Sequence, residues 1–422
     1  MPAPTTPPVK PTDRLHRRAR WAVLAVFAVA VGVTQMLWLN FAPLLSMVQR
    51  RYGVSELVAS GLVLVFPLVY VLLSVPAGAV IDAKGYRFGI GLGAVLTAAF
   101  AGLRIWDTRF AVLMVAQVGL AVAQPFVVNG IAKLVADWFD ESEGATANGL
   151  GTGGMFLGMA IGMAATPELE AAGGLRWTMV AFFLVAVAAA AAFILVAREN
   201  PTSASGAAQP TAASEASAFG LLLKDRQLLL CFAAAFLGLG TFNGLTTWLE
   251  QILAPQGIEA TTAGLVGGVL IVGGIAGAVV IPLLSDKAQR RRPFLIACSV
   301  VSAGCTWLLC RATGVSALMT YGALLGFFFM PAFALLLDVS AKFAGVKHAG
   351  AATSLLMLCG NAGAVVVIVA VPLLKDALGG YAVPVALMSG AMLVAAVAGL
   401  VMREPGAAPV AAGALAQAAA VP

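Results

Sequence analysis

Residues 78–87 read Gly-Ala-Val-Ile-Asp-Ala-Lys-Gly-Tyr-Arg, a short polar stretch between two long apolar runs. The runs, Val54–Ile81 and Phe88–Ile105, are each long enough to cross a bilayer core of about 30 Å at about 1.5 Å per helical residue. Because so few residues join them, the two runs are predicted to form an antiparallel pair of transmembrane helices.

The connection between these runs has the chemistry of a hinge. Asp82 can accept hydrogen bonds from nearby helix N-termini, and Arg87 supplies the opposite charge. Gly78 and Gly85 let backbones approach closely. The spacing alone is equally compatible with a charged turn that only fixes the topology of the chain.

A partial second copy of this stretch lies in the other half of the chain. Residues 282–291 read Pro-Leu-Leu-Ser-Asp-Lys-Ala-Gln-Arg-Arg and follow another apolar run. Asp286 and Arg291 recur at the offsets of Asp82 and Arg87, while Pro282 and Gln289 stand where the first copy has its two glycines. The repeat indicates that the chain is duplicated.

With this repeat the sequence resembles the major facilitator superfamily, whose signature loop reads G-x-L-a-D-r-x-G-r-[RK] between transmembrane helices two and three and recurs, degraded, between helices eight and nine. The resemblance implies an all-α polytopic membrane protein with twelve transmembrane helices in two six-helix bundles, which work by alternating access. It also implies a gating role for the loop residues Gly78, Asp82, Gly85, Arg87, Asp286, Arg290 and Arg291.

The composition indicates a polytopic membrane protein independently of any motif. Hydrophobic residues make up 61% of the chain, charged residues make up 10%, and the mean hydropathy is +0.96, whereas soluble domains average about 25% charged residues. The net charge of +6 is a topology signal, because the basic residues are scattered at the ends of apolar runs, and no nucleic-acid partner is expected. The five cysteines show no C-x-x-C spacing and no catalytic motif occurs, so we expect packing cysteines, no metal, no cofactor and no enzymatic activity.

One glycine-rich segment needs separate treatment. Residues 149–154 read Gly-Leu-Gly-Thr-Gly-Gly and satisfy the nucleotide-binding pattern G-x-G-x-x-G, but no strand precedes them and the run to Gly162 is apolar. We interpret the segment as packing of small residues between helices.

The expected organisation has five segments. A disordered cytoplasmic tail (1–20) precedes an N-terminal six-helix bundle (21–197), a cytoplasmic linker (198–227), a C-terminal six-helix bundle (228–402) and a second disordered tail (403–422). The expected transmembrane spans are Trp21–Val48, Val54–Ile81, Phe88–Ile105, Phe110–Ala136, Gly144–Thr166, Trp177–Val196, Leu228–Ile252, Thr262–Leu284, Pro293–Cys310, Ser316–Ser340, Ala349–Leu374 and Ala382–Val401.

The distribution of basic residues predicts the orientation. With the N-terminus inside the cell, 18 of the 25 Lys and Arg residues lie on the cytoplasmic side and 7 lie outside. This bias follows the positive-inside rule and places both termini, both signature loops and the linker on the inner face of the cell membrane.

Polar residues deep inside apolar runs are the candidates for a substrate site, because a polar side chain facing lipid is unfavourable. Residues three, four or seven apart share one face of a helix. The candidates are Gln35, Trp38, Gln117, Gln124, Asn243, Thr247 and Asn361. The alternative for each is a hydrogen bond between neighbouring helices, and only the convergence of these residues from corresponding helices favours a cavity.

Charged residues are scarce at mid-depth. No Asp, Glu, Lys or Arg lies near the middle of the first, fourth, fifth or seventh span, and Glu250 and Asp338 lie close to the ends of their spans. Proton-coupled transporters usually need a buried titratable group, so this pattern favours an uncoupled facilitator or a neutral or cationic substrate.

A closer resemblance follows the first, fourth and seventh spans. The segments 35–41 (Gln-Met-Leu-Trp-Leu-Asn-Phe), 51–55, 123–128, 136–139 and 240–251 are similar to the feline leukaemia virus subgroup C receptor-related branch of the superfamily. That branch is associated with choline, ethanolamine and haem transport, and Trp38 and Gln124 match its cavity residues by position. Asn243 stands where the branch has a tyrosine and Asn361 where it has a glutamine, which leaves the aromatic cage for a quaternary ammonium incomplete.

Two classes of function remain open at this point. The first is a secondary active or facilitative transporter of a small organic solute, and the second is a membrane sensor or receptor that keeps the transporter fold without transporting. We expect a monomer surrounded by membrane lipid, with a small cationic or neutral solute as its partner.

Overall fold

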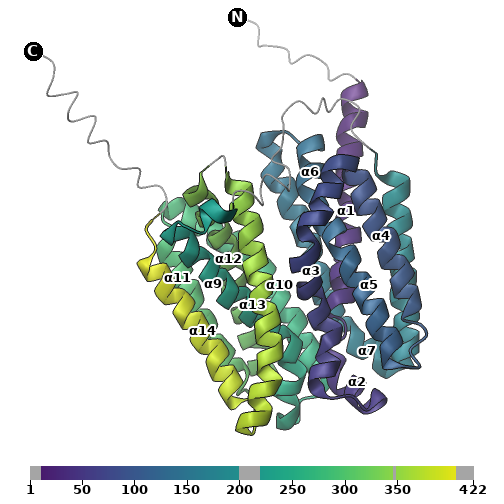
Figure 1. Cartoon of the computed structure of the whole chain (residues 1–422), viewed down its shortest axis with the longest axis vertical. Helices are drawn as coiled ribbons and strands as arrows, with labels where there is room; N and C mark the ends of the chain where they lie inside the picture. Colours follow the sequence, from purple (N-terminus) through teal and green to yellow (C-terminus); the bar gives the residue numbers. More distant parts are fainter. Residues whose placement is uncertain (1–10, 199–218, 346–347, 405–422) are drawn as a thin grey trace, which may run out of the picture. The chain divides into compact units, whose positions relative to one another are not determined.

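The structure, a computed structural model, describes residues 11–198, 219–345 and 348–404, and these residues form long helices as predicted (Figure 1). The helices are α1 (Pro11–Leu39), η1 (Ala42–Leu44), α2 (Leu45–Tyr52), α3 (Glu56–Lys84), α4 (Tyr86–Leu103), α5 (Phe110–Val128), α6 (Gly130–Trp138), α7 (Glu141–Val196), α9 (Arg226–Leu253), η2 (Ala254–Gln256), α10 (Ala260–Ala288), α11 (Arg292–Leu309), α12 (Val315–Ala344), α13 (Ala349–Leu378) and α14 (Ala382–Val401).

Residues 78–87 form the tight connection that was predicted. A single residue, Gly85, separates α3 from α4, and its φ of 85° lies in the region that favours glycine. Ser55 begins α3, where its hydroxyl accepts a hydrogen bond from the backbone N–H of Val58. The two helices therefore form the expected hairpin.

The second loop has a residue with positive φ at the position where the first loop has one. Gln289 occupies the position that corresponds to Gly85, and its φ is 52°. Among the described residues it is the sole residue other than glycine with a positive φ. Because residues other than glycine rarely adopt a positive φ, its occurrence at the corresponding position agrees with the duplication seen in the sequence.

The fifth and sixth predicted spans appear as one helical element, α7. Eleven helices in the described part of the chain are long and apolar enough to cross a membrane, and one of them covers 51 residues, Thr146–Val196. That length corresponds to about 75 Å, far more than one crossing needs. Gly174, with φ 78° and ψ 169°, breaks the helix between the two predicted spans. The eleven helices therefore supply the twelve crossings of the predicted fold.

The ends of the predicted segments need correction. Residues 11–20, expected in a disordered tail, form the first turns of α1, and proline at the first position suits a helix start because it has no N–H to lose. In the expected linker, residues 219–222 are helical and α9 begins at Arg226. The expected tail residues 1–10 and 405–422 and the linker residues 199–218 lie outside the described part.

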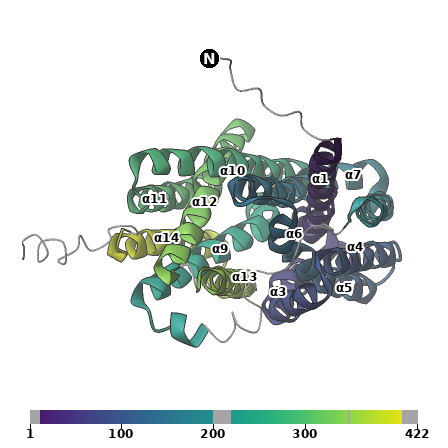
Figure 2. The ribbon, with the colours of Figure 1, turned by 90° about the horizontal axis from the view of Figure 1, so that it is seen from above.

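Contacts divide the chain into two units. Unit 1 contains Met1–Ala213, Thr246–Val272 and Thr313–Met319, and unit 2 contains Ser214–Leu245, Gly273–Ala312 and Thr320–Pro422. In unit 1, α3, α4 and α5 lie side by side (Figure 2). Unit 1 thus includes the end of α9 and the beginning of α10, so these units do not coincide with the halves that the sequence repeat predicts.

Small residues allow α1 and α7 to pack closely in unit 1. A Cβ atom added to Gly158 would lie 1.9 Å from the carbonyl oxygen of Gly32, and one added to Gly154 would lie 2.6 Å from that of Ala28. Such contacts between backbones provide van der Waals attraction between helices in lipid. The predicted role in helix packing holds for Gly154, whereas an added Cβ atom on Gly149 or Gly153 would meet nothing within 4 Å.

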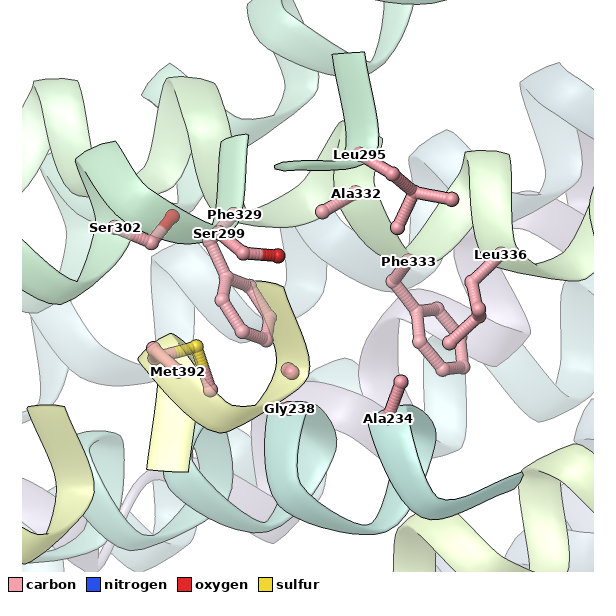
Figure 3. A pocket seen from close by; sticks show the side chains of 11 residues that line it. Ala234, Gly238, Leu295, Ser299, Ser302, Phe329, Ala332, Phe333, Leu336 and Met392 are labelled. Atoms are coloured by element: carbon pink, nitrogen blue, oxygen red, sulfur yellow. The ribbon is translucent and has the colours of Figure 1, made fainter. Parts of the chain in front are cut away.

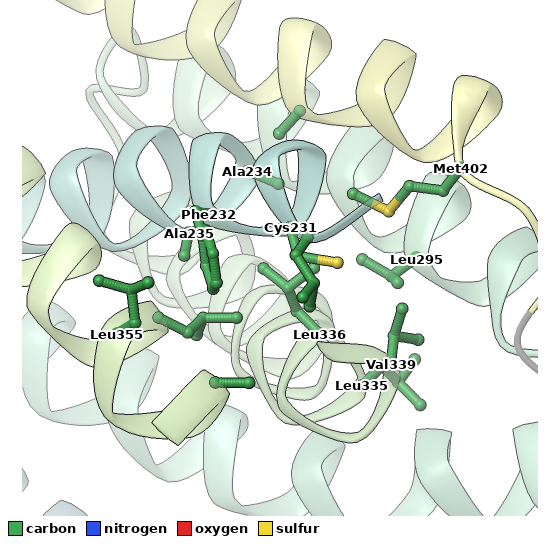
Figure 4. Packing of buried hydrophobic residues seen from close by; sticks show 14 of the residues in the cluster. Cys231, Phe232, Ala234, Ala235, Leu295, Leu335, Leu336, Val339, Leu355 and Met402 are labelled. Atoms are coloured by element: carbon green, nitrogen blue, oxygen red, sulfur yellow. The ribbon is translucent and has the colours of Figure 1, made fainter. Parts of the chain in front are cut away.

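The core of unit 2 is built from aliphatic, aromatic and thiol side chains (Figure 4). Cys231 and Cys298 belong to this cluster and are buried. All five cysteines are free thiols. They act as small packing residues, as the sequence predicted.

We predict that Gly158→Leu prevents α1 from packing against α7. The new side chain meets backbone atoms that cannot move aside, so the free energy of unfolding should fall by about 3 kcal/mol or more. Thermal unfolding of the purified protein measures this loss. Gly153→Ala is the matched control, because a Cβ atom there meets nothing within 4 Å. Equal unfolding temperatures for the two variants would contradict the packing account.

Candidate functional site

Trp38 lies where the first predicted span changes direction. The helix α1 ends at Leu39, the short helix η1 follows, and α2 starts at Leu45. The indole Nε1 of Trp38 donates a hydrogen bond of 3.1 Å to the carbonyl oxygen of Val63 on α3. That oxygen lacks its usual helical partner because residue 67, four positions later, is a proline without an N–H.

The ring of Trp38 is also held in place. It stacks against Phe66 with 6.0 Å between ring centroids and 27° between planes, and 8% of the residue is exposed. Gln117 on α5 donates a hydrogen bond of 2.7 Å to the carbonyl oxygen of Leu62. Trp38 and Gln117 thus donate hydrogen bonds to the carbonyl groups of two consecutive residues of α3. For Gln117, this is the bond between neighbouring helices that the sequence left open as the alternative to a solute contact.

Three other residues predicted for the substrate site lie in unit 1 and are buried. They are Gln35, Gln124 and Thr247, with exposures of at most 4%. The Oε1 atom of Gln35 and the Oγ1 atom of Thr247 have no hydrogen-bond partner among the described residues. Because a buried polar atom without a partner costs free energy, these atoms are suited to receive a ligand or water.

The two predicted asparagines belong to unit 2. Asn243 donates to the carbonyl oxygen of Leu239 at 2.8 Å, and Asn361 donates to that of Met357 at 2.9 Å. Each bond reaches back four residues along the same helix. These two bonds are therefore intrahelical.

Glu250 on α9 is a buried carboxylate whose partner the sequence did not reveal. Its Oε2 atom accepts hydrogen bonds from the backbone N–H of Ser46 at 3.3 Å and from the hydroxyl of Ser46 at 3.0 Å. Ser46 lies in the first turn of α2, where the helix dipole favours a negative charge. The break in the first span thus creates a helix N-terminus that holds the carboxylate.

A buried cation lies at the end of α4. Arg104 is 1% exposed, and its Nη2 donates to the Oδ1 of Asn40 at 2.8 Å. Its guanidinium lies 4.6 Å from the ring centroid of Phe41. The sequence indicated only a basic residue near a helix end.

The first signature loop is anchored by neighbouring helices. Lys133 on α6 donates hydrogen bonds to the carbonyl oxygens of Ile81 and Asp82, at 3.2 and 2.8 Å. A lysine in this position satisfies carbonyl groups at the end of α3 and suits the helix dipole. Tyr86 bonds to the carbonyl oxygen of Arg198 at the end of α7, so the loop is tied to the segment that follows the sixth predicted span.

The second signature loop carries a network of charges. Arg291 bonds to Asp286 in its own loop and, at 2.8 Å, to Asp338 on α12. Partial burial works to lower the pKa of Arg291, but the bonds to both carboxylates outweigh it and raise the pKa. Arg87, the corresponding residue of the first loop, is exposed, as is Arg290.

The carboxylate of Glu404 covers the beginning of α11. Its oxygens accept hydrogen bonds from the backbone N–H groups of Arg291 and Arg292. The side chain of Arg292 in turn donates to the carbonyl oxygens of Gly399 and Leu400 at the end of α14. The end of the described chain is thereby fixed to the second signature loop.

Long apolar helices, a repeated charged loop and buried polar side chains define a polytopic membrane protein of the transporter class. The sequence profile of the Major Facilitator Superfamily matches residues 27–368 and 252–421. The chain belongs to the Major Facilitator Superfamily, and membrane transport is the class of function that this membership supports.

Curated relatives confirm the branch that the sequence resembled. The solute carrier family 49 member A3 of Danio rerio is 32% identical over 65% of this chain and 60% of its own length. The choline/ethanolamine transporter flvcr2b of Danio rerio is 26% identical over 69% and 64%, and the choline/ethanolamine transporter FLVCR2 of Homo sapiens is 25% identical over 64% and 55%. The chain spans less than two thirds of the length of each of these relatives.

We predict that the bond between Trp38 and Val63 depends on Pro67. Trp38→Phe leaves the carbonyl of Val63 without a donor and should lower the free energy of unfolding by about 0.5 to 1.5 kcal/mol. In a Pro67→Ala background the restored N–H at residue 67 reaches the same carbonyl, so the loss should be smaller. Thermal unfolding of the four proteins of this cycle measures the difference. Equal losses in both backgrounds would rule out this pairing.

Proposed function

We propose that this protein moves a small organic solute, neutral or cationic, across the membrane by alternating access. The observation that carries the proposal is the repeated loop, in which Gly85 and Gln289 stand at corresponding positions with positive φ and whose charges hold neighbouring helix ends. Buried polar side chains inside the apolar helices give this duplicated scaffold a means of binding a solute.

We propose that Gln35, Trp38, Gln117, Gln124, Asn243, Thr247 and Asn361 contact the solute. Trp38 offers an aromatic face and apolar area, and contacts between a cation and a ring contribute about 0.5 to 2 kcal/mol. The choline/ethanolamine transporters among the relatives support a small amine or alcohol as substrate. The asparagines at 243 and 361 favour a solute with fewer methyl groups than choline, because they offer hydrogen bonds in place of an aromatic wall.

The signature loops are proposed to stabilise one of two arrangements of the protein. Arg291 joins Asp286 to Asp338, and Lys133 holds the end of α3 at Asp82. Bonds of this kind form in one conformation and break in another, which shifts the balance between the two states. The residues Gly78, Asp82, Gly85, Arg87, Asp286, Arg290 and Arg291 would thus act as the latch of a gate.

The excess of Lys and Arg on one side supports cytoplasmic termini and a location in the cell's inner or plasma membrane. We propose this orientation together with a monomeric state. A reporter fused after Arg403 should read as cytoplasmic, and an external reading would overturn the orientation.

Proton coupling is a second candidate, and Glu250 is the observation that favours it. A carboxyl group buried inside a membrane helix marks a functional site more often than a structural one. Glu250 is 5% exposed and bonds to Ser46. Uptake or release of a proton at this carboxyl would break or restore that bond as the protein changes conformation.

Uptake into proteoliposomes tests the proposal. The full chain should accumulate or equilibrate at least one labelled member of a panel of small amines, amino alcohols and neutral polyols. Arg291→Gln should lower the rate several-fold while folded protein remains, and Lys287→Gln, at an exposed position in the same loop, is the matched control. Proton coupling would be established if a pH gradient stimulates uptake by the wild type but does not change uptake by Glu250→Gln.

Two outcomes would count against transport. Saturable binding of a solute without any flux would favour the alternative, a membrane receptor that keeps the transporter fold. Flux that is identical in Arg291→Gln, Lys287→Gln and the wild type would show that Arg291 has no part in gating.

A further inference from the structure

Arg104 carries a buried charge that the proposed transport function does not yet use. The residue is 1% exposed, and its Nη2 donates to the Oδ1 of Asn40 at 2.8 Å. Its Nε and Nη1 atoms have no hydrogen-bond partner among the described residues, and neither has the Nδ2 atom of Asn40. Asp107, the acidic residue nearest to it along the chain, is bonded to Arg51 at 2.7 Å. Burial of a cation that is paired in this incomplete way lowers the stability of a fold.

A buried polar group without a partner is not always informative. The hydroxyl of Ser302 in unit 2 also lacks a partner among the described residues, but it lines a cavity of about 30 Å³ between α9, α11, α12 and α14 (Figure 3). A cavity of that size holds a water molecule, which can satisfy a neutral hydroxyl. A water molecule does not neutralise a guanidinium, so Arg104 needs another explanation.

Both groups that Arg104 contacts belong to the turn that follows α1. Asn40 accepts its hydrogen bond, and the ring centroid of Phe41 lies 4.6 Å from the guanidinium carbon. Asn40 and Phe41 are both 0% exposed. Pro43 comes next, in η1, and without an N–H it cannot donate an α-helical bond to the carbonyl of Leu39. The turn is therefore not held by a continuous helix, and Arg104 holds it from the end of α4.

Trp38 lies two residues before Asn40, at the beginning of the same turn. On the side of α3, its indole bonds to the carbonyl oxygen of Val63 at 3.1 Å and stacks against Phe66. These contacts hold the ring, while the path of the backbone after Trp38 depends on the residues that Arg104 contacts. The ring and the backbone of Trp38 are thus fixed from different helices, α3 and α4.

We propose that Arg104 is a positioning residue, which holds the turn after Trp38 so that the indole presents one orientation to the solute. This inference rests on the proposed function, in which Trp38 contacts the solute. A guanidinium suits the task because it can bond to an amide oxygen and contact an aromatic ring at the same time. Groups that prepare a binding site commonly do so at a cost in stability. Replacing Arg104 by an apolar side chain should therefore weaken binding without weakening the fold.

Arg104→Met separates positioning from a merely structural role. Methionine has a long side chain without a charge, so the unfolding temperature of the purified protein should stay the same or rise. The KM for a solute that the wild type transports should rise about threefold to tenfold, the loss expected for one hydrogen bond, while kcat changes less. Arg109→Met is the matched control, because Arg109 lies five residues further along and is exposed. It should leave KM and the unfolding temperature unchanged.

Fluorine NMR reports on Trp38 without any solute. The full chain is labelled with 5-fluorotryptophan, and the resonance of Trp38 is assigned by its absence from Trp38→Phe. We expect a single line in the wild type and in Arg109→Met. In Arg104→Met the line should broaden or split, because the ring then adopts more than one orientation. If Arg104→Met does not fold, Asn40→Ala, which removes the acceptor from the turn, should produce the same change.

Several results would overturn the proposal. A single, unbroadened Trp38 resonance in Arg104→Met would show that Arg104 does not hold the turn. A lower unfolding temperature with an unchanged KM would assign Arg104 a structural role alone. A split resonance with an unchanged KM would show that the orientation of Trp38 does not determine binding. Absence of flux in the wild type would contradict the proposed function, and the resonance would still decide whether Arg104 positions Trp38.

Discussion

Close contact between helix backbones is the constraint on which the rest of this structure depends. In unit 1 the contact is between α1 and α7 at Gly32 and Gly158, and in unit 2 it is between α9 and α13, where a Cβ atom on Gly363 would lie 2.0 Å from the carbonyl oxygen of Phe236. In lipid, apolar side chains gain little by leaving their surroundings, so helices associate through packing of this kind. The first and fifth spans of one half correspond to the seventh and eleventh of the other, and the duplicated chain uses the same means twice.

Prolines inside helices are a second recurring feature. Each removes one N–H from its helix and leaves a carbonyl oxygen free for another partner. Pro67 leaves the oxygen of Val63, which receives the indole of Trp38. Pro331 leaves the oxygen of Phe327, and a Cβ atom on Gly277 would lie 1.9 Å from it. A proline inside a helix thus creates a polar site within an apolar interior, and at Val63 a neighbouring helix satisfies it. Trp38, one of the residues proposed to bind a solute, is held by this arrangement.

The sequence was sufficient to predict the features that depend on the pattern of residues within one segment. Apolar runs located the membrane helices, the repeated loop indicated duplication, and glycine spacing indicated helix packing. It could not show contacts between distant segments, such as the bond from Ser46 to Glu250 or from Asn40 to Arg104, because pattern within one helix carries no information on its neighbours. It also placed the start of α1 too late, since the apolar run begins at Trp21 while the helical backbone continues back to Pro11.

The central claim is that the two signature loops belong to parts of the protein that move relative to each other. Distance measurements between spin labels test it most directly, with labels at Ala83→Cys and Ala288→Cys, two exposed positions beside the loops, in a transport-competent variant without the native cysteines. The account predicts at least two distance populations whose proportions change when a transported solute is added. One narrow distribution that is the same with and without the solute would contradict it.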